Sequence, residues 1–434
     1  MAAALLLVGC HGGAARPSAS RTFPQPPCGT YDGRGCAPPS ERVDLARPSF
    51  SDPTRITNPL FPIGRLRSVV LLGHVEGKPF RTETTLLPGS RTVVWDGRSI
   101  RVLVSQYLAY LDGRVEEVAL DRYAQADDGS VWYFGEDVFD YRSGTIANTE
   151  GTWLAGREGP PAMIMPAKPR VGDVFRTENV PGVVFEEVTV KAVDRTVAGP
   201  VGPVAGSMVG RELHSDRTGE DKLFAPGYGE FRTAGGGDLE ALALAVPANA
   251  LPGPLPAELR NMTTGAIGIL ESTRTRDWPA AASTDRRVDA ARRVLRAGRP
   301  QPRMVAARMD DALAQLRSPV RARRPGRAGQ AAIDVTQSVL DLELRYRPAA
   351  QVDADRFVLH TQQLRVDAAA HDLAGVTSEV VVLEWIRDRL SAPGRRAVEV
   401  GLRALRAAAD AKNLPAAADH AARLAARVRA LSSG

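Results

Sequence analysis

Four closely spaced prolines form a run that divides the chain into two parts with different hydrophobic patterns. Pro247, Pro252, Pro254 and Pro256 fall within ten residues, and proline interrupts both helices and central strands because it lacks a backbone donor. Before this run, apolar and polar residues alternate over short segments, which is typical of antiparallel strands joined by tight turns. After it, apolar residues recur every three or four positions, as in amphipathic helices. The sequence therefore predicts a multi-domain fold with β structure first and α structure second.

We expect residues 50–246 to form an antiparallel β meander. Segments such as 115–120 and 131–134 have the length and alternation of strands, and Asp128-Gly129 supplies a turn before the second of them. A sheet of many short strands leaves unpaired edges unless it curls, which favours a closed or half-closed barrel.

Residues 281–434 are expected to form an all-α helical bundle or helical-hairpin domain, after a proline-rich linker and connector at 247–280. Prolines separate seven candidate helices in this part. The last has the clearest apolar stripe, whose members recur by threes and fours: Leu414, Ala417, Ala421, Leu424, Val428 and Leu431. With 434 residues, 44% of them hydrophobic, the chain is long enough for two cores.

The positive charge of the chain does not indicate a nucleic-acid partner. The formal net charge is +6, and the basic residues are almost all arginines interleaved with Asp and Glu. The densest basic run, at 317–327, has no aromatic residues on which bases would stack. We therefore expect no nucleic acid among the partners.

The first ten residues resemble a bacterial lipoprotein signal. An apolar run ends in Leu-Val-Gly-Cys at positions 7–10, the form in which a small residue precedes a lipidated cysteine. The run lacks a basic start, which we interpret as a start codon placed too late. Residues 1–9 would be a signal remnant, Cys10 the lipid anchor to the cell membrane, and residues 10–49 a disordered tether.

Lipidation of Cys10 leaves an even pair of cysteines, Cys28 and Cys36. In an oxidising compartment these two thiols could close a small loop by a disulfide. A zinc site is disfavoured, because two thiols without a nearby histidine supply only half of a four-ligand shell.

Three strings in the β part carry a resemblance to a known family. They are ITNPxFP at 56–62, DGxVWYFGED at 128–137 and APGxGE at 225–230. With these motifs the chain resembles a family of uncharacterised exported bacterial lipoproteins of actinobacterial type. The resemblance implies export, and it implies no activity, because the family has none assigned.

The densest group of aromatic and acidic residues lies on one expected hairpin: Tyr123, Trp132, Tyr133, Glu136 and Asp137. The rings could stack on a saccharide while the acids accept its hydroxyl protons, or two carboxylates could catalyse hydrolysis. Because successive strand residues point to opposite faces, we expect part of this group to belong to the core.

A polar stripe on the helix after Asp353 is a weaker candidate for a metal site. His360, Asp367 and His371 share one helix face, yet the paired Glu-x-x-His strings of ferritin-like sites do not occur. A solvated or interhelical polar seam is the favoured interpretation. The chain also lacks P-loop, dinucleotide, His-Glu-x-x-His and Gly-x-Ser-x-Gly strings.

Together these features favour a lipid-anchored extracytoplasmic protein without a cofactor. We expect a non-catalytic binding or interaction module of the cell envelope that takes an envelope ligand or a protein partner. One alternative is an envelope hydrolase acting through carboxylates near Glu136 and Asp137. The other is a structural adaptor that docks a partner through its helices.

Overall fold

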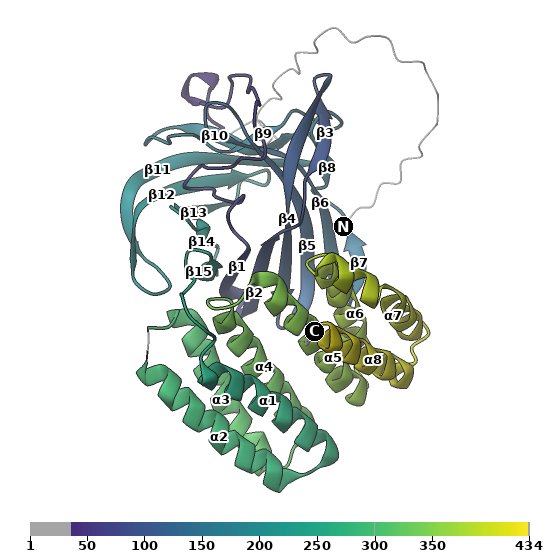
Figure 1. Ribbon diagram of the computed structural model, residues 1–434. Coiled ribbons are helices and arrows are strands. Elements are labelled where there is room, and N and C mark those ends of the chain that lie inside the picture. The colour runs from purple at the N-terminus through teal and green to yellow at the C-terminus, as the bar shows by residue number, and fades with distance from the viewer. Residues whose placement is uncertain (1–35, 299, 433–434) are drawn as a thin grey trace.

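The computed structural model describes residues 36–298 and 300–432, and within these ranges fifteen strands precede eight helices (Figure 1). Cys10 and Cys28 lie outside the described residues, and Cys36 is disulfide-bonded. Among the described residues, no helix combines the length and apolar character needed to cross a membrane.

The strands are β1 (Ser68–Val75), β2 (Lys78–Leu86), β3 (Arg91–Trp95), β4 (Arg98–Leu111), β5 (Arg114–Gln125), β6 (Val131–Arg142), β7 (Thr145–Asn148), β8 (Trp153–Leu154), β9 (Ala162–Met165), β10 (Val174–Val180), β11 (Val184–Ala198), β12 (Pro203–His214), β13 (Gly219–Ala225), β14 (Gly229–Gly235) and β15 (Asp238–Val246). The helices are α1 (Ala257–Thr275), α2 (Trp278–Ala297), α3 (Arg303–Arg321), α4 (Pro325–Glu343), α5 (Ala349–Ala369), α6 (Leu373–Arg387), α7 (Ala392–Asp410) and α8 (Leu414–Ser432).

All strand pairs are antiparallel, and most strands pair with their neighbours in the chain. The order is β10-β11-β12-β13-β14-β15-β1-β2-β4-β5-β6-β7, while β3 pairs with β4, and β8 and β9 pair with β6. The pair Asp112-Gly113, with φ of 50° and 77°, forms the tight turn between β4 and β5. The end strands β7 and β10 do not pair with each other. The sheet is therefore half-closed, and the closed barrel is excluded.

The helices follow the sheet as the apolar periodicity predicts, with one addition. Helix α1 lies in the range 247–280 that the sequence analysis assigned to the connector. Its buried residues Leu259, Met262, Ala266 and Ile269 recur by threes and fours. Two glycines and four threonines weaken this apolar signal.

The helices pack against the outer face of part of the sheet, at β1, β4, β5 and β15 (Figure 1). Val70 and Leu72 of β1 share a buried cluster with residues of α1, α3 and α4, while Leu108 and Tyr110 of β4 share another with residues of α5 to α8. Because side chains alternate along a strand, the odd-numbered neighbours Val69 and Leu71 lie on the opposite, inner face.

A buried network of charges joins the helices to the sheet. Arg81 donates to both oxygens of Asp341 on α4, at 2.7 and 2.8 Å, and to Glu83 at 2.6 Å. Arg389, which follows α6, donates to Glu83 at 2.6 Å. The six side chains, of which none is more than 7% exposed, are Arg81, Glu83, Asp341, Asp353, Arg356 and Arg389. We call them the interface ion network.

Residues 36–49, which the sequence analysis placed in the disordered tether, pack against the sheet. The Val43 amide donates to the Val174 carbonyl at 2.9 Å, and buried Asp44 accepts from the Arg176 amide at 3.1 Å. These contacts satisfy backbone groups at the edge strand β10, which a sequence without periodicity does not predict.

Candidate functional site

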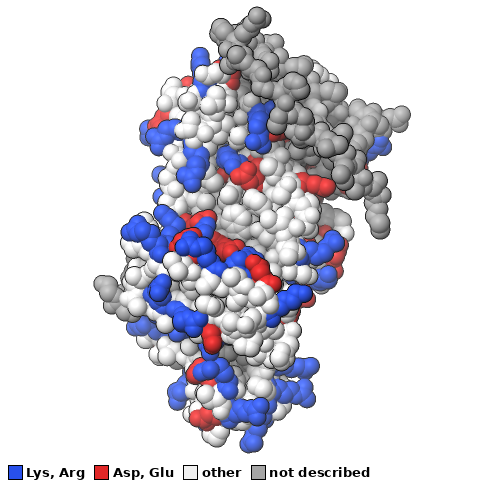
Figure 2. Space-filling model, turned by 90° about the vertical axis from the view of Figure 1, so that its right-hand side faces the viewer, with Lys and Arg blue, Asp and Glu red and all other residues white. Residues whose placement is uncertain are grey.

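The inner face of the sheet carries acidic side chains from eight strands. On the side of the molecule shown in Figure 2, basic and acidic side chains are interspersed. On the inner face, three carboxylates surround the ammonium group of Lys222, and further carboxyl groups lie on the other strands. We call the following residues the carboxylate cluster: Glu117, Asp121, Glu136, Glu178, Glu186, Glu212, Glu220, Glu230 and Glu240.

Lys222 of β13 is held by three of these carboxylates. Its ammonium nitrogen lies 3.2 Å from Glu212, 3.2 Å from Glu220 and 3.5 Å from Glu230. These charges keep the pKa of Lys222 well above its usual value although burial opposes this. Lys222 in turn lowers the pKa of Glu230, again against the effect of burial. The cluster is thus built to hold a positive charge.

The other acids of the cluster accept hydrogen bonds mainly from neutral groups. Asp121 accepts from the Tyr133 hydroxyl at 2.8 Å and from Ser105 at 3.2 Å. Glu178 accepts from the Trp153 indole at 2.9 Å. In the described part of the chain, no lysine or arginine forms an ion pair with five of them: Glu117, Asp121, Glu136, Glu178 and Glu240.

Burial next to like charges raises the pKa of these carboxyls. The pKa of Glu136 rises to about 8, through burial and the charge of Asp121, and that of Glu212 to about 8, through burial and Glu186. Burial brings the pKa of Glu117 and Glu240 to about 7, and that of Asp121 to about 6. Without a further cation, several of these groups therefore hold a proton at neutral pH.

A cavity of about 120 Å³ opens beside the cluster. Asp121, Glu230 and Glu240 provide its acidic wall, and Tyr107 and Tyr123 its aromatic wall. Apolar side chains from the loop before β1 cover the remaining side: Phe61, Pro62, Ile63 and Leu66.

Two of the sequence motifs converge on this cavity. The string at 56–62 supplies Phe61, whose ring lies edge-on to Tyr123 with centroids 4.9 Å apart. Within it, the Asn58 amide donates to the carbonyls of Gly129 and Pro166, at 3.1 and 3.0 Å, and so fixes the loop. The string at 225–230 supplies Glu230. Each of the two motifs thus positions one wall of the cavity.

The pleat separates the five residues singled out in the sequence. Tyr123 and Tyr133 stack at 4.9 Å between centroids on the inner face, where Glu136 lies opposite Asp121. Trp132 is buried on the other face, and its indole donates to Ser130 at 2.8 Å. Asp137 also points away from the cluster and pairs with Arg122. Three of the five therefore meet in the candidate site.

The other acids of the cluster were not recognised in the sequence. Glu178, Glu186, Glu212 and Glu240 lie on four different strands and belong to no recognisable motif. Their only signal is a charge at a position that alternation assigns to a buried face, and long-range pairing alone brings them together.

The polar residues predicted to share one face of α5 do not converge to form a metal site. His360 pairs with Glu379 at 2.8 Å, and Asp367 accepts from Arg114 and from Gln363, each at 3.0 Å. His371 follows the helix with φ of 58°. Among the described residues, the group with suitable metal-ligand spacing is instead Glu186, Glu212 and His214, whose ligand atoms lie within 4.8 Å of one another.

The raised pKa values predict that stability falls as the pH rises. Glu136 and Glu212 bind protons more tightly in the folded state than in the unfolded chain, where their pKa is near 4.5. Their stabilising contribution is complete below this value and is lost as the pH passes through about 8. We expect the melting temperature, measured in chelator-treated buffer, to fall between about pH 6 and pH 9. Glu136→Gln should reduce this fall, since an amide stays neutral, and a melting temperature that rises over the same interval would contradict the assignment.

Neither models of known protein families nor curated protein sequences match the chain.

Proposed function

We propose that this protein is a lipid-anchored extracytoplasmic binding protein, not an enzyme, and that its half-closed sheet captures a small multivalent cation. The observation that supports this is the excess of inward-facing carboxyls over the single ammonium of Lys222. The anchor in this proposal is Cys10, and the family resemblance in the sequence agrees with export.

Electrostatics gives the reason for a cationic ligand. Buried carboxylates raise one another's pKa, so that several acids of the cluster hold protons when no further cation is bound. A cation removes this cost, because it attracts the ionised form of every acid around it. Lys222 shows that these strands already hold one charge in this way. A further cation would replace the protons on the acids that lack such a partner.

The donor set indicates the chemistry of the ligand. Carboxylate and hydroxyl oxygens suit hard divalent ions such as calcium and manganese, and His214 adds one nitrogen donor beside Glu186 and Glu212. The same carboxylates suit the ammonium groups of a polyamine. Glu212 is 2% exposed and directs Oε2 toward Lys222 at 3.2 Å. This oxygen accepts no hydrogen bond from a described residue, while Oε1 accepts from Thr177 at 3.3 Å.

Calorimetric titration tests the proposal with three probes: calcium chloride, manganese chloride and spermidine. We expect at least one probe to bind with 1:1 stoichiometry, more tightly at pH 8.5 than at pH 6, and to release protons at the lower pH. Proton release is detected as a difference in the measured binding enthalpy between buffers. Glu240→Gln should weaken binding at least about tenfold, the effect of one lost charge contact of about 1.4 kcal/mol.

Glu76→Gln is the matched control, because this side chain on the β1–β2 turn is 75% exposed and lies outside the cluster. Binding by a metal ion alone, or by spermidine alone, identifies which class of cation the site takes. The proposal would be contradicted if none of the three probes gave a heat of binding, or if Glu240→Gln bound as tightly as the wild type.

A second candidate, a carboxylate-dependent hydrolase, is favoured by one contact. The carboxyls of Glu136 and Glu178 are hydrogen-bonded to each other, and burial raises the pKa of both. One acid kept protonated beside another is the arrangement of a catalytic carboxyl pair. Release of reducing ends from an envelope polysaccharide by the wild type, and not by Glu136→Gln, would support the hydrolase over the binding protein.

A further inference from the structure

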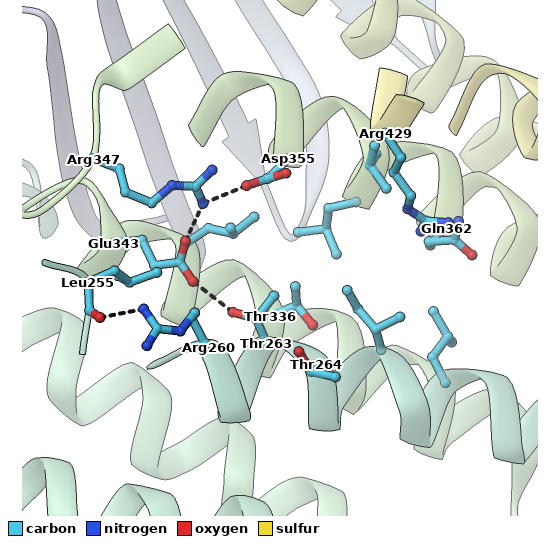
Figure 3. A pocket seen from close by; sticks show the side chains of 15 residues that line it. Leu255, Arg260, Thr263, Thr264, Thr336, Glu343, Arg347, Asp355, Gln362 and Arg429 are labelled. Atoms are coloured by element: carbon cyan, nitrogen blue, oxygen red, sulfur yellow. Dashed lines mark hydrogen bonds and ion pairs between the residues drawn. The ribbon is translucent and has the colours of Figure 1, made fainter. Parts of the chain in front are cut away.

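The helical part holds a second cavity, of about 400 Å³, among α1, α4, α5 and α8 (Figure 3). This volume lies within the range of about 300–1,000 Å³ that is typical of ligand sites. None of its lining residues belongs to the carboxylate cluster. An inference about it is therefore independent of the proposed cation site.

The middle of the cavity is apolar. Ile267 and Leu270 of α1 face Leu340 of α4 and Val358 and Leu359 of α5. Such a surface gains free energy by covering hydrocarbon and offers little to a fully polar ligand. Figure 3 shows polar side chains at two sides of the cavity, Arg260 and Arg347 at one and Arg429 at the other, an arrangement that suits an extended chain between them.

At one polar end two carboxylates share one arginine, while Arg260 forms no ion pair with a described residue. Glu343 is 2% exposed, accepts from Thr263 at 2.9 Å and pairs with Arg347, which also pairs with Asp355 at 2.6 Å. The guanidinium of Arg260 donates to the Leu255 carbonyl at 2.7 Å, and no carboxylate of the described residues pairs with it. Arg260 can therefore receive an anion.

At the other end, Arg429 of α8 and Gln362 of α5 lie side by side (Figure 3). Arg260 and Arg429 both line the cavity and are exposed, so each meets water. A charged head group bound there keeps part of its hydration, while a chain attached to it reaches the apolar floor.

From this placement we infer that the helical cavity binds an anionic amphiphile with a single acyl chain. The chain lies along Ile267, Leu340 and Leu359, and the carboxylate or phosphate head is held by Arg260. A free fatty acid and a lysophospholipid share this chemistry.

The test uses the full chain with Cys10 replaced by alanine, so that no covalent lipid competes. Uptake of cis-parinaric acid, a fluorescent fatty acid, should saturate at one molecule per chain. Palmitate and lysophosphatidylglycerol are the competitors, and the one that displaces the probe at the lower concentration identifies the source of the head group. Hexadecanol, which has the chain without the charge, should compete at least about tenfold less well.

Two variants locate the binding. Ile267→Trp should abolish uptake by filling the apolar floor, and Arg260→Gln should weaken it at least about tenfold. Arg286→Gln, an exposed arginine on α2 outside the cavity, is the matched control and should bind as the wild type does. Glu240→Gln should also leave uptake unchanged, which separates this site from the cation site. The inference is overturned if uptake is absent, or if it is equal in Arg260→Gln and the wild type.

Discussion

Asp341→Asn is expected to lower the free energy of unfolding by about 3–5 kcal/mol, the cost of leaving a buried charge without its partner. Asp341 is fully buried and accepts from Arg81 at 2.7 and 2.8 Å and from Arg356 at 2.8 Å. The interface ion network balances three arginines against three acids. Asparagine keeps the shape of the side chain and removes one negative charge, so that the network carries an unpaired positive charge out of reach of water.

Urea unfolding followed by circular dichroism measures this effect. Glu271→Gln is the matched control, because Glu271 also pairs with an arginine, Arg274, but is 55% exposed. Its loss should cost less than about 1 kcal/mol, as is usual for surface pairs. A cost for Asp341→Asn as small as that of the control would show that water reaches the network.

Cys10→Ala is expected to move the protein from the membrane fraction into the soluble fraction. Each methylene of a membrane-inserted chain contributes about 0.8 kcal/mol, so two acyl chains on one cysteine give an anchor that does not dissociate. The change should therefore be complete.

Fractionation of the host cells, followed by intact mass of the native protein, provides the measurement. Cys28→Ala is the control, because its thiol is not part of the string at 7–10 and its loss should leave the protein in the membrane. A native protein without acyl chains, or a Cys10→Ala protein that remains in the membrane fraction, would exclude the anchor.

The order of the two parts was predictable, because alternation and helical periodicity are local patterns. Residues 115–120 and 131–134 lie within β5 and β6. The last of the expected helices corresponds to α8. Helix α1 was missed because Gly265 and Gly268 weaken its signal. The edge contacts of Val43 and Asp44 were missed because they depend on β10, far along the chain.

The candidate site was predictable only where it is local. Tyr123 and Tyr133 pair across one hairpin and share a face, whereas simple alternation places Glu136 on the opposite face; the register shift of the hairpin brings Glu136 opposite Asp121. Glu186, Glu212 and Glu240 join them through the pairing of β11 to β15, which is set over more than fifty residues. A bulge at Asp121–Tyr123 also shifts the register of the hairpin itself. No short pattern contains this information.

The proline run separates two patterns, yet the chain cannot be divided there. A fragment ending at Val246 would expose Val70, Leu72 and Leu108 to water. It would also leave Arg81 and Glu83 without the oppositely charged side chains that the helical part supplies. The sheet and the helices packed against it are therefore expected to unfold in one transition rather than as two independent units.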